Sequence, residues 1–193
     1  LIRAMLGEDR AFYELFEPLH FGPMDPAHLG RWIEERLAAA GLDAPGIGAR
    51  ILAVAGDRTR DAVRLALAVW HRPTGEDEAE PAERVRRGLE RVVAEEDDRM
   101  RVVWDNLTDH QQDVLRAVAW NGAGLTAAET LERFALGHGG TARNTALALA
   151  GRGLLRKADT TSGYAFDSPF VRGWVVRHAL PDVGLRLPID HPA

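Results

Sequence analysis

Residues 108–120 read TDHQQDVLRAVAW, residues 125–134 read LTAAETLERF and residues 141–152 read TARNTALALAGR. Each stretch has apolar residues at the spacing of a helix face, such as Val114, Leu115 and Val118 in the first. Two short segments, 154–156 and 164–166, then lie on either side of an expected turn at 159–163. Three helices followed by a two-stranded hairpin predict a winged helix-turn-helix.

The ends of these three helices carry local signals. Thr108 or Asp109 is expected to cap the first helix, and Thr126 with Glu129 has the spacing of a capping box for the second. Gly153 is expected to end the third helix. The expected inward face of the third helix consists of Ala142, Ala146 and Leu149.

The composition is that of a globular protein. A chain of 193 residues has room for two domains of roughly 100 residues each. No apolar run approaches the roughly 18 residues of a membrane span, and the first residues lack an export signal. Without cysteine there is neither a disulfide nor a thiolate metal site, so we expect a cytoplasmic protein with no membrane contact.

The charge is unevenly spread along the chain. Residues 1–100 hold 14 Lys+Arg against 20 Asp+Glu, whereas residues 101–193 hold 10 against 9. Neither half has the basic excess of a protein whose affinity rests mainly on neutralising phosphates.

The first residues indicate a fragment of a longer protein, because the chain opens at Leu1 without an initiator methionine. FEPLHF at 16–21 suits a short strand better than a helix because of Pro18. Nothing nearby offers it a partner, so we expect the sheet of this strand to lie upstream.

Three short helices are predicted next, over 26–40, 45–55 and 59–70, and they form a small bundle. Asp25 is the expected cap of the first helix, with Pro26 at its first position, and Gly41 and Gly56 end the first two. The expected inward faces are Leu29, Trp32, Ile33 and Leu37, then Ile47, Ile51 and Val54, then Val63, Ala66, Leu67 and Trp70.

A long helix over 81–105 is predicted to join this bundle to the winged helix, after the polar linker 71–80. Pro169 opens a last helix with Phe170, Trp174 and Val175 inward, and the Pro- and Gly-rich tail is irregular. The predicted fold is mainly α, with a lid-like domain at 1–80, the connector and winged helix at 81–180, and a tail at 181–193.

This order of elements resembles the C-terminal part of archaeal-type ATPases of the STAND class, within the AAA+ superfamily. The resemblance rests on FEPLHFGPMD, VAGDRTRDAVRLALAVW, VVWDNLTDHQQDVLRAVA, GLLRK and SPFVRGW, in that order. It implies a helical lid and a winged helix that follow an ATPase core. The chain departs from the family at Arg58, where proline is common, and at Ser168, where aspartate is common, with Asp167 one place earlier.

The chain lacks the sequence that holds nucleotide phosphates. A phosphate loop needs Gly-Lys-Ser/Thr, and the only lysine, Lys157, lies between Arg156 and Ala158. We therefore expect no catalytic residues, no metal site and no cofactor in this chain. The resemblance implies that ATP and magnesium bind in the missing core.

Arginines of the lid could still reach a phosphate held by that core. Arg58, Arg60 and Arg64 lie just after Gly56, at the start of a helix where an anion is favoured. Arg58 and Arg60 are the candidate cofactor contacts. The alternative is that these arginines form surface ion pairs with Asp57 and Asp61.

The third helix of the winged helix could read DNA or contact a protein. Arg143 and Asn144 suit base edges, whereas Leu147 and Ala148 offer no hydrogen bonds and suit a protein partner such as the missing core. The candidate DNA contacts are Thr141, Arg143, Asn144, Arg152, Arg156 and Lys157.

We therefore expect a regulatory module, not an enzyme, in which the lid senses nucleotide and the winged helix contacts protein or, weakly, DNA. The alternative is a free-standing winged-helix transcription regulator whose N-terminal helices form a dimer. A glycine-lysine phosphate loop about 150 or more residues upstream of Leu1 favours the first reading. An initiator methionine immediately upstream favours the second.

Overall fold

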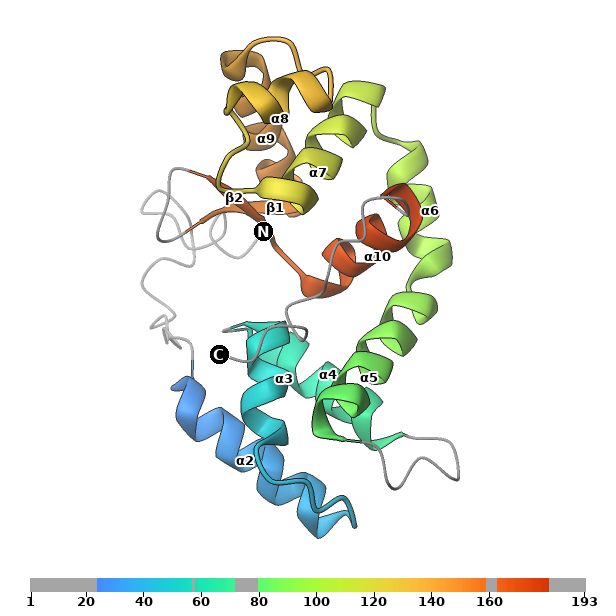
Figure 1. The fold of residues 1–193 in the computed structure, drawn as a ribbon. Helices are drawn as coiled ribbons and strands as arrows, with labels where there is room; N and C mark the ends of the chain where they lie inside the picture. The colour runs from blue at the N-terminus through green and yellow to red at the C-terminus, as the bar shows by residue number, and fades with distance from the viewer. Residues whose placement is uncertain (1–23, 57, 72–79, 159–162, 181–193) are drawn as a thin grey trace, which may run out of the picture.

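The computed structural model describes residues 24–56, 58–71, 80–158 and 163–180, and Figure 1 shows their arrangement. The expected strand at 16–21, most of the linker, most of the hairpin turn and the tail lie outside these residues. The described chain is mainly helical with one two-stranded antiparallel sheet. None of its helices is long and apolar enough to cross a membrane.

A bundle of α2 (Pro26–Ala39), α3 (Ile47–Ala55) and α4 (Thr59–Trp70) forms one end of the molecule. Asp25 caps α2 as expected, because its carboxylate accepts a hydrogen bond of 2.7 Å from the backbone N–H of His28. The predicted inward residues of α2 and α3 are buried except Trp32, whose side chain is half exposed. Local capping and periodicity therefore predicted α2 well. Periodicity also predicted α3, although this helix begins at Ile47 and not at Pro45 and has no side-chain cap.

The predicted inward face of α4 was wrong at three of its four residues, and only Ala66 is buried as expected. Val63, Leu67 and Trp70 are 40%, 51% and 41% exposed, whereas Leu65 and Val69 are buried. The sequence of α4 is apolar on two sides, so periodicity alone could not choose which side packs against α2, α3 and α5.

The long connector is two helices, α5 (Pro81–Glu95) and α6 (Asp97–Asp105), which run along one side of the molecule (Figure 1). The predicted single helix is interrupted at Glu96, whose φ and ψ are −87° and −3°. Residues 95–98 are all acidic, so this stretch has no apolar side chain that could pack against the bundle and keep the helix straight. Ion pairs hold Glu96 instead, as described below.

The other end of the molecule contains α7 (Asp109–Asn121), α8 (Ala128–Arg133), α9 (Gly139–Gly151), β1 (Leu155–Lys157) and β2 (Tyr164–Phe166). A capping box joins Thr108 and Gln111 at the start of α7. The capping box expected at Thr126 was wrong, because α8 begins two residues later and Ala127 at its N-cap makes no side-chain bond.

The predicted core of this unit is confirmed. Ala142, Ala146 and Leu149 of α9 are fully buried, and α9 packs against α7 and β1. The strands pair in antiparallel register with Arg156 opposite Ala165. The backbone N–H of Tyr164 also donates to the carbonyl of Gly122 at 3.0 Å, which ties the hairpin to the segment after α7.

The last helix, α10 (Pro169–Ala179), lies between the two ends and packs against α5, α6 and α7. Ser168 caps it by accepting a bond of 3.3 Å from the backbone N–H of Phe170. The predicted inward residues Phe170, Trp174 and Val175 are buried. The position of α10 brings the hairpin close to the bundle, and this approach creates the candidate site.

Candidate functional site at the junction of the bundle and the hairpin

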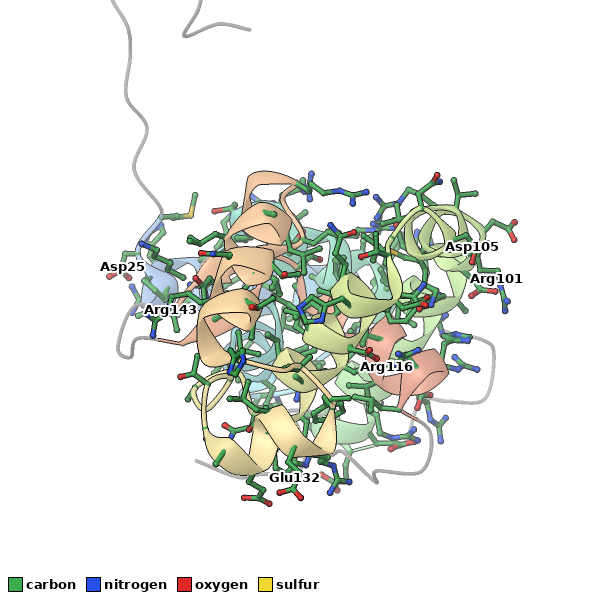
Figure 2. All side chains as sticks on the ribbon, turned by 90° about the horizontal axis from the view of Figure 1, so that it is seen from above. Asp25, Arg101, Asp105, Arg116, Glu132 and Arg143 are labelled. Atoms are coloured by element: carbon green, nitrogen blue, oxygen red, sulfur yellow. The ribbon has the colours of Figure 1, made fainter. Side chains whose placement is uncertain are left out.

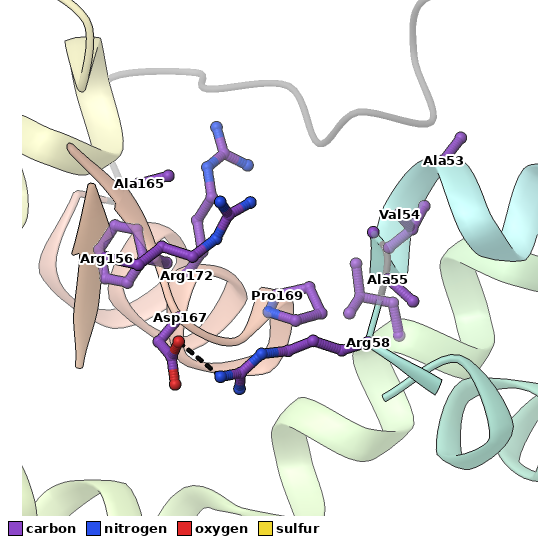
Figure 3. Close-up of a pocket in the computed structure, with 12 residues that line it drawn as sticks. Ala53, Val54, Ala55, Arg58, Arg156, Ala165, Asp167, Pro169 and Arg172 are labelled. Atoms are coloured by element: carbon purple, nitrogen blue, oxygen red, sulfur yellow. Dashed lines mark hydrogen bonds and ion pairs between the residues drawn. The ribbon is translucent and has the colours of Figure 1, made fainter. Parts of the chain in front are cut away.

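A cleft of about 240 Å³ lies between the end of α3 and the hairpin. Gly56 ends α3 with a φ of 70°, which turns the chain and places Arg58 at the mouth of the cleft as the N-cap of α4. Figure 3 shows Arg156 and Arg172 turned into the cleft. Its charged lining residues are Arg58, Arg156, Asp167 and Arg172.

Arg58 joins the bundle to the hairpin unit. Its Nη2 lies 2.6 Å from Oδ1 of Asp167, which directly follows β2, and Figure 3 marks this ion pair. The side chains are 39% and 22% exposed, so water still screens the pair. An exposed pair contributes only about 0.2–1 kcal/mol. Arg58 therefore makes a weak contact with Asp167 across the junction. Asp57, one of the two lid carboxylates named as alternative partners, lies outside the described residues.

Arg60 points away from this contact into solvent. Its side chain is 83% exposed, and Nε lies 3.4 Å from Oδ1 of Asp61. Asp61 itself is buried, and its Oδ2 has no hydrogen-bond partner. Arg60 is therefore the lid arginine that a bound anion could reach with least rearrangement.

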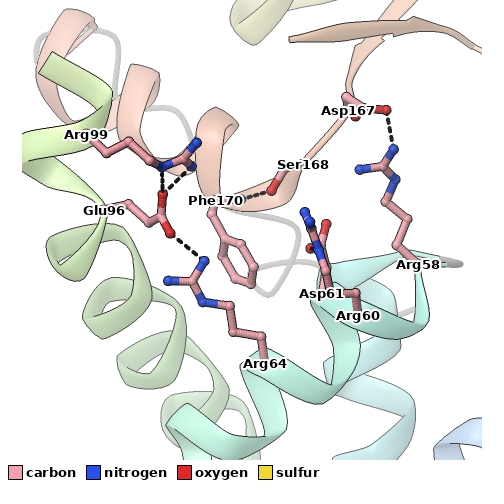
Figure 4. Close-up of polar contacts among 9 residues, drawn as sticks. All are labelled: Arg58, Arg60, Asp61, Arg64, Glu96, Arg99, Asp167, Ser168 and Phe170. Carbon is pink, nitrogen blue, oxygen red and sulfur yellow. Dashed lines mark hydrogen bonds and ion pairs between the residues drawn. The ribbon is translucent and has the colours of Figure 1, made fainter. Parts of the chain in front are cut away.

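Arg64 joins the bundle to the connector. Its Nη1 lies 2.5 Å from Oε1 of Glu96, and Arg99 pairs with the same carboxylate (Figure 4). Partial burial opposes ionisation of Glu96, but the hydrogen bonds from the two arginines outweigh it and lower the pKa of this carboxyl below its usual range. A second hollow of about 280 Å³ is lined by four arginines: Arg60, Arg64, Arg99 and Arg152.

The face of α9 that was expected to contact DNA or a protein is exposed. Figure 2 shows Arg143 at the outer surface, and Thr141, Asn144, Leu147 and Ala148 are exposed with it. Among the described residues of α9, this face therefore carries one cation, two polar side chains and an apolar pair.

The candidate phosphate contacts near α9 separate into two groups. Arg152 and Lys157 are exposed at the end of α9 and on β1. Arg156 is half buried and lines the cleft between the hairpin and the bundle. Arg156 therefore belongs with Arg58 and Arg172 and not with the α9 surface.

Sequence reasoning did not select Asp167, Arg172 or Asp61 as site residues. One feature of the sequence could have identified Asp167 as a site residue, because it stands one place before the position where the resembled family has aspartate. No feature of the sequence could have identified Arg172, since its place in the cleft depends on the packing of α10 against the hairpin.

In the described part of the chain, no three histidine, aspartate or glutamate side chains are grouped to hold a metal ion. No family model matches the sequence, and comparisons with curated proteins and with solved structures give no match. The junction and the exposed face of α9 are therefore the features that bear on function.

Proposed function

We propose that this chain is the regulatory C-terminal module of a STAND-type ATPase. The helical bundle acts as the lid that senses nucleotide, and the three-helix unit with its hairpin acts as a winged helix that passes this state on. The observation that carries the proposal is the ion pair between Arg58 and Asp167, because it joins the expected sensor to the expected output unit.

The pair provides a way to relay nucleotide state. A phosphate group held by an ATPase core carries more negative charge than a single carboxylate, and it would compete with Asp167 for Arg58. The pair is screened by water and weak enough to exchange. Asp167 lies directly before Ser168, the cap of α10, so release of Arg58 frees the segment that joins the hairpin to α10.

The output surface is the exposed face of α9. Leu147 and Ala148 favour contact with a protein, with the ATPase core itself as the first candidate. ATP and magnesium would bind in that core, and this chain would not hydrolyse ATP alone because it has no phosphate loop.

The test compares two substitutions in the protein that includes the ATPase core. Arg58→Ala should lower ATP turnover about tenfold, which corresponds to about 1.4 kcal/mol of transition-state stabilisation. Asp167→Asn breaks the same ion pair but keeps Arg58. This variant should therefore keep the ATP turnover of wild type, and only the response of turnover to the protein that binds the exposed face of α9 should change. Steady-state ATPase assays on variants checked for folding measure both.

Equal turnover in wild type, Arg58→Ala and Arg60→Ala would contradict a sensing role. The coding sequence upstream of Leu1 gives a second test, because the proposal requires a glycine-lysine phosphate loop there.

The alternative, a DNA-binding regulator, is favoured by the exposure of Arg143 and Asn144. We expect weak binding with little sequence preference, at a dissociation constant of roughly 10–100 µM at physiological salt. Because Arg156 lies in the cleft, three cations remain near α9: Arg143, Arg152 and Lys157. At about 0.9 for each phosphate contact, they give a slope near −2.7 for the logarithm of DNA affinity against the logarithm of salt concentration.

Fluorescence anisotropy against random and selected duplexes at several salt concentrations measures both quantities. Nanomolar binding to one selected sequence, lost in Arg143→Ala and retained in Arg177→Ala on the distant α10, would establish DNA reading instead.

A further inference from the structure

We infer that the groove between α2 and α4 binds an amphipathic helix of a partner protein, whose apolar side chains enter the groove and whose acidic margin meets Arg36. This inference does not depend on the ATPase proposal, because no residue that lines the groove belongs to the cleft at the junction or to α9. It gives the bundle an interaction surface of its own.

The first argument is the apolar surface that stays uncovered along α2 and α4. Trp32, Val63, Leu67 and Trp70 are all partly exposed, and they line one groove of about 270 Å³. Among the described residues that line this groove, Arg36 is the only charged one. Single exposed apolar side chains are normal, but several that gather in one groove mark an interaction site.

The second argument is that two contacts hold the groove in shape. Nε1 of Trp70 donates a hydrogen bond of 3.4 Å to the carbonyl oxygen of Ala40, which joins the ends of α2 and α4. The guanidinium of Arg36 lies over the ring of Trp32, 5.7 Å from its centre, at a cation–π distance. Both tryptophan rings are therefore in place before a partner binds, and little ordering is needed on binding.

The third argument is the length and chemistry of the groove. From Val63 to Trp70 the chain rises about 10 Å along α4, and a bound helix with apolar anchors at i, i+3, i+4 and i+7 has the same span. An extended peptide would leave its backbone N–H and C=O groups unpaired, because the walls are helices with apolar side chains. The groove therefore suits a helix, which satisfies its own backbone groups.

The fourth argument is the charge of Arg36. Among the residues that the structure describes, no carboxylate pairs with this guanidinium, which contacts the Trp32 ring. A wholly apolar partner would cover the cation without a counter-charge, which is costly. A carboxylate beside the apolar face of the partner would supply a charge-assisted hydrogen bond instead.

A second copy of this chain fits the groove less well. In a symmetric dimer the same patch meets itself, so two Arg36 side chains would share one interface. A fully buried aromatic side chain covers about 150–250 Å², so the four partly exposed side chains offer at most about 400 Å² together. A standard interface needs about 800 Å² from each partner.

The experiment uses a labelled synthetic helix of four turns, with leucine at i, i+3, i+4 and i+7 and glutamate beside this face. Fluorescence anisotropy with the full 193-residue chain at constant ionic strength should show saturable binding. The same peptide with lysine in place of each glutamate should bind at least about tenfold more weakly, because its charges repel Arg36. Arg36→Glu should reverse this preference.

Matched controls separate the groove from the rest of the surface. Leu67→Asn should weaken binding of the glutamate peptide at least about tenfold, whereas Val102→Asn, at an exposed apolar side chain of α6, should not. Arg31→Glu makes the same charge change on α2 at a residue that lines a different hollow, and it should keep the preference. No saturable binding, equal binding by Leu67→Asn and wild type, or an unchanged preference in Arg36→Glu would overturn the inference.

Two other occupants have their own readouts. Sedimentation velocity should show the same species for wild type and Leu67→Asn, and a dimer that only wild type forms would assign the groove to a second copy. Residues 1–23 lie outside the described residues and are rich in aromatic side chains, so Phe12→Asn/Phe16→Asn tests them. Unchanged peptide binding in this variant supports a separate partner. Binding that becomes about tenfold tighter would show that the chain itself fills the groove, and would overturn the inference.

Discussion

Replacing Gly48 by alanine is expected to lower the free energy of unfolding by about 3 kcal/mol, at the upper end of the usual cost of overpacking. A Cβ atom at this position would lie 2.0 Å from the carbonyl oxygen of Gly30. That oxygen is backbone of α2, so relief requires α2 and α3 to move apart. Their buried side chains, such as Ile33 and Ile51, would lose contact. Urea unfolding followed by circular dichroism measures the change.

Two further glycines provide controls. A Cβ at Gly30 would meet the end of the Leu52 side chain at 3.1 Å, so Gly30→Ala should cost less than Gly48→Ala. Gly140, near the start of α9, has nothing within 4 Å of an added Cβ. Gly140→Ala should therefore be neutral or stabilise the chain by about 0.4–1 kcal/mol. If Gly48→Ala and Gly140→Ala unfold at the same urea concentration, the close contact of α2 with α3 is not present.

Replacing Trp174 by alanine is expected to cost about 3–5 kcal/mol, the range for a large buried aromatic side chain. The ring is buried, is tilted against Trp104 at 5.6 Å and is stacked on His178 at 4.8 Å. Its Nε1 donates to Oδ1 of Asp97 at 2.8 Å. This bond, followed by that from Arg101, lowers the pKa of Asp97. The residue therefore holds α10 on α6.

Trp174→Phe separates packing from hydrogen bonding, because it keeps a ring and removes the N–H donor. It should cost less than half of the loss in Trp174→Ala. Trp70→Ala is the control for tryptophan in general, since Trp70 is half exposed on α4, and it should also cost less than half as much. Equal losses in Trp70→Ala and Trp174→Ala would show that α10 does not depend on this contact. The measurement is again the free energy of unfolding in urea.

The ends of helices could be predicted from the sequence because the interactions that make them are local. Asp25 caps α2 through a backbone N–H three residues away, and Thr108 does the same for α7. Gly56 and Gly153 have positive φ, which glycine adopts without strain, and they end α3 and follow α9 as expected. The order of helices and strands in the C-terminal unit could be predicted for the same reason.

The candidate site could be predicted only in part. The arginines near Gly56 stood out because residue type and position along a helix are visible in sequence. Asp61, the partner of Arg60, was visible because it is the next residue, but the partners of Arg58 and Arg64 were not, because Asp167 lies 109 residues from Arg58 and Glu96 lies 32 residues from Arg64. Long-range ion pairs depend on how helices pack, which the order of elements does not specify.

The sequence by itself determined the mainly helical class, the positions of most helices, the inward faces of α3 and α9 and that of α2 except Trp32, since capping and a single apolar stripe are local properties. Tertiary structure decided which of two apolar sides of α4 is buried, where the connector breaks at Glu96 and which arginines meet in the cleft. The physical reason is that these outcomes depend on close packing of α4 against α2, α3 and α5 and of α10 against α5, α6 and β2, in which each side chain must fit neighbours that are distant in sequence.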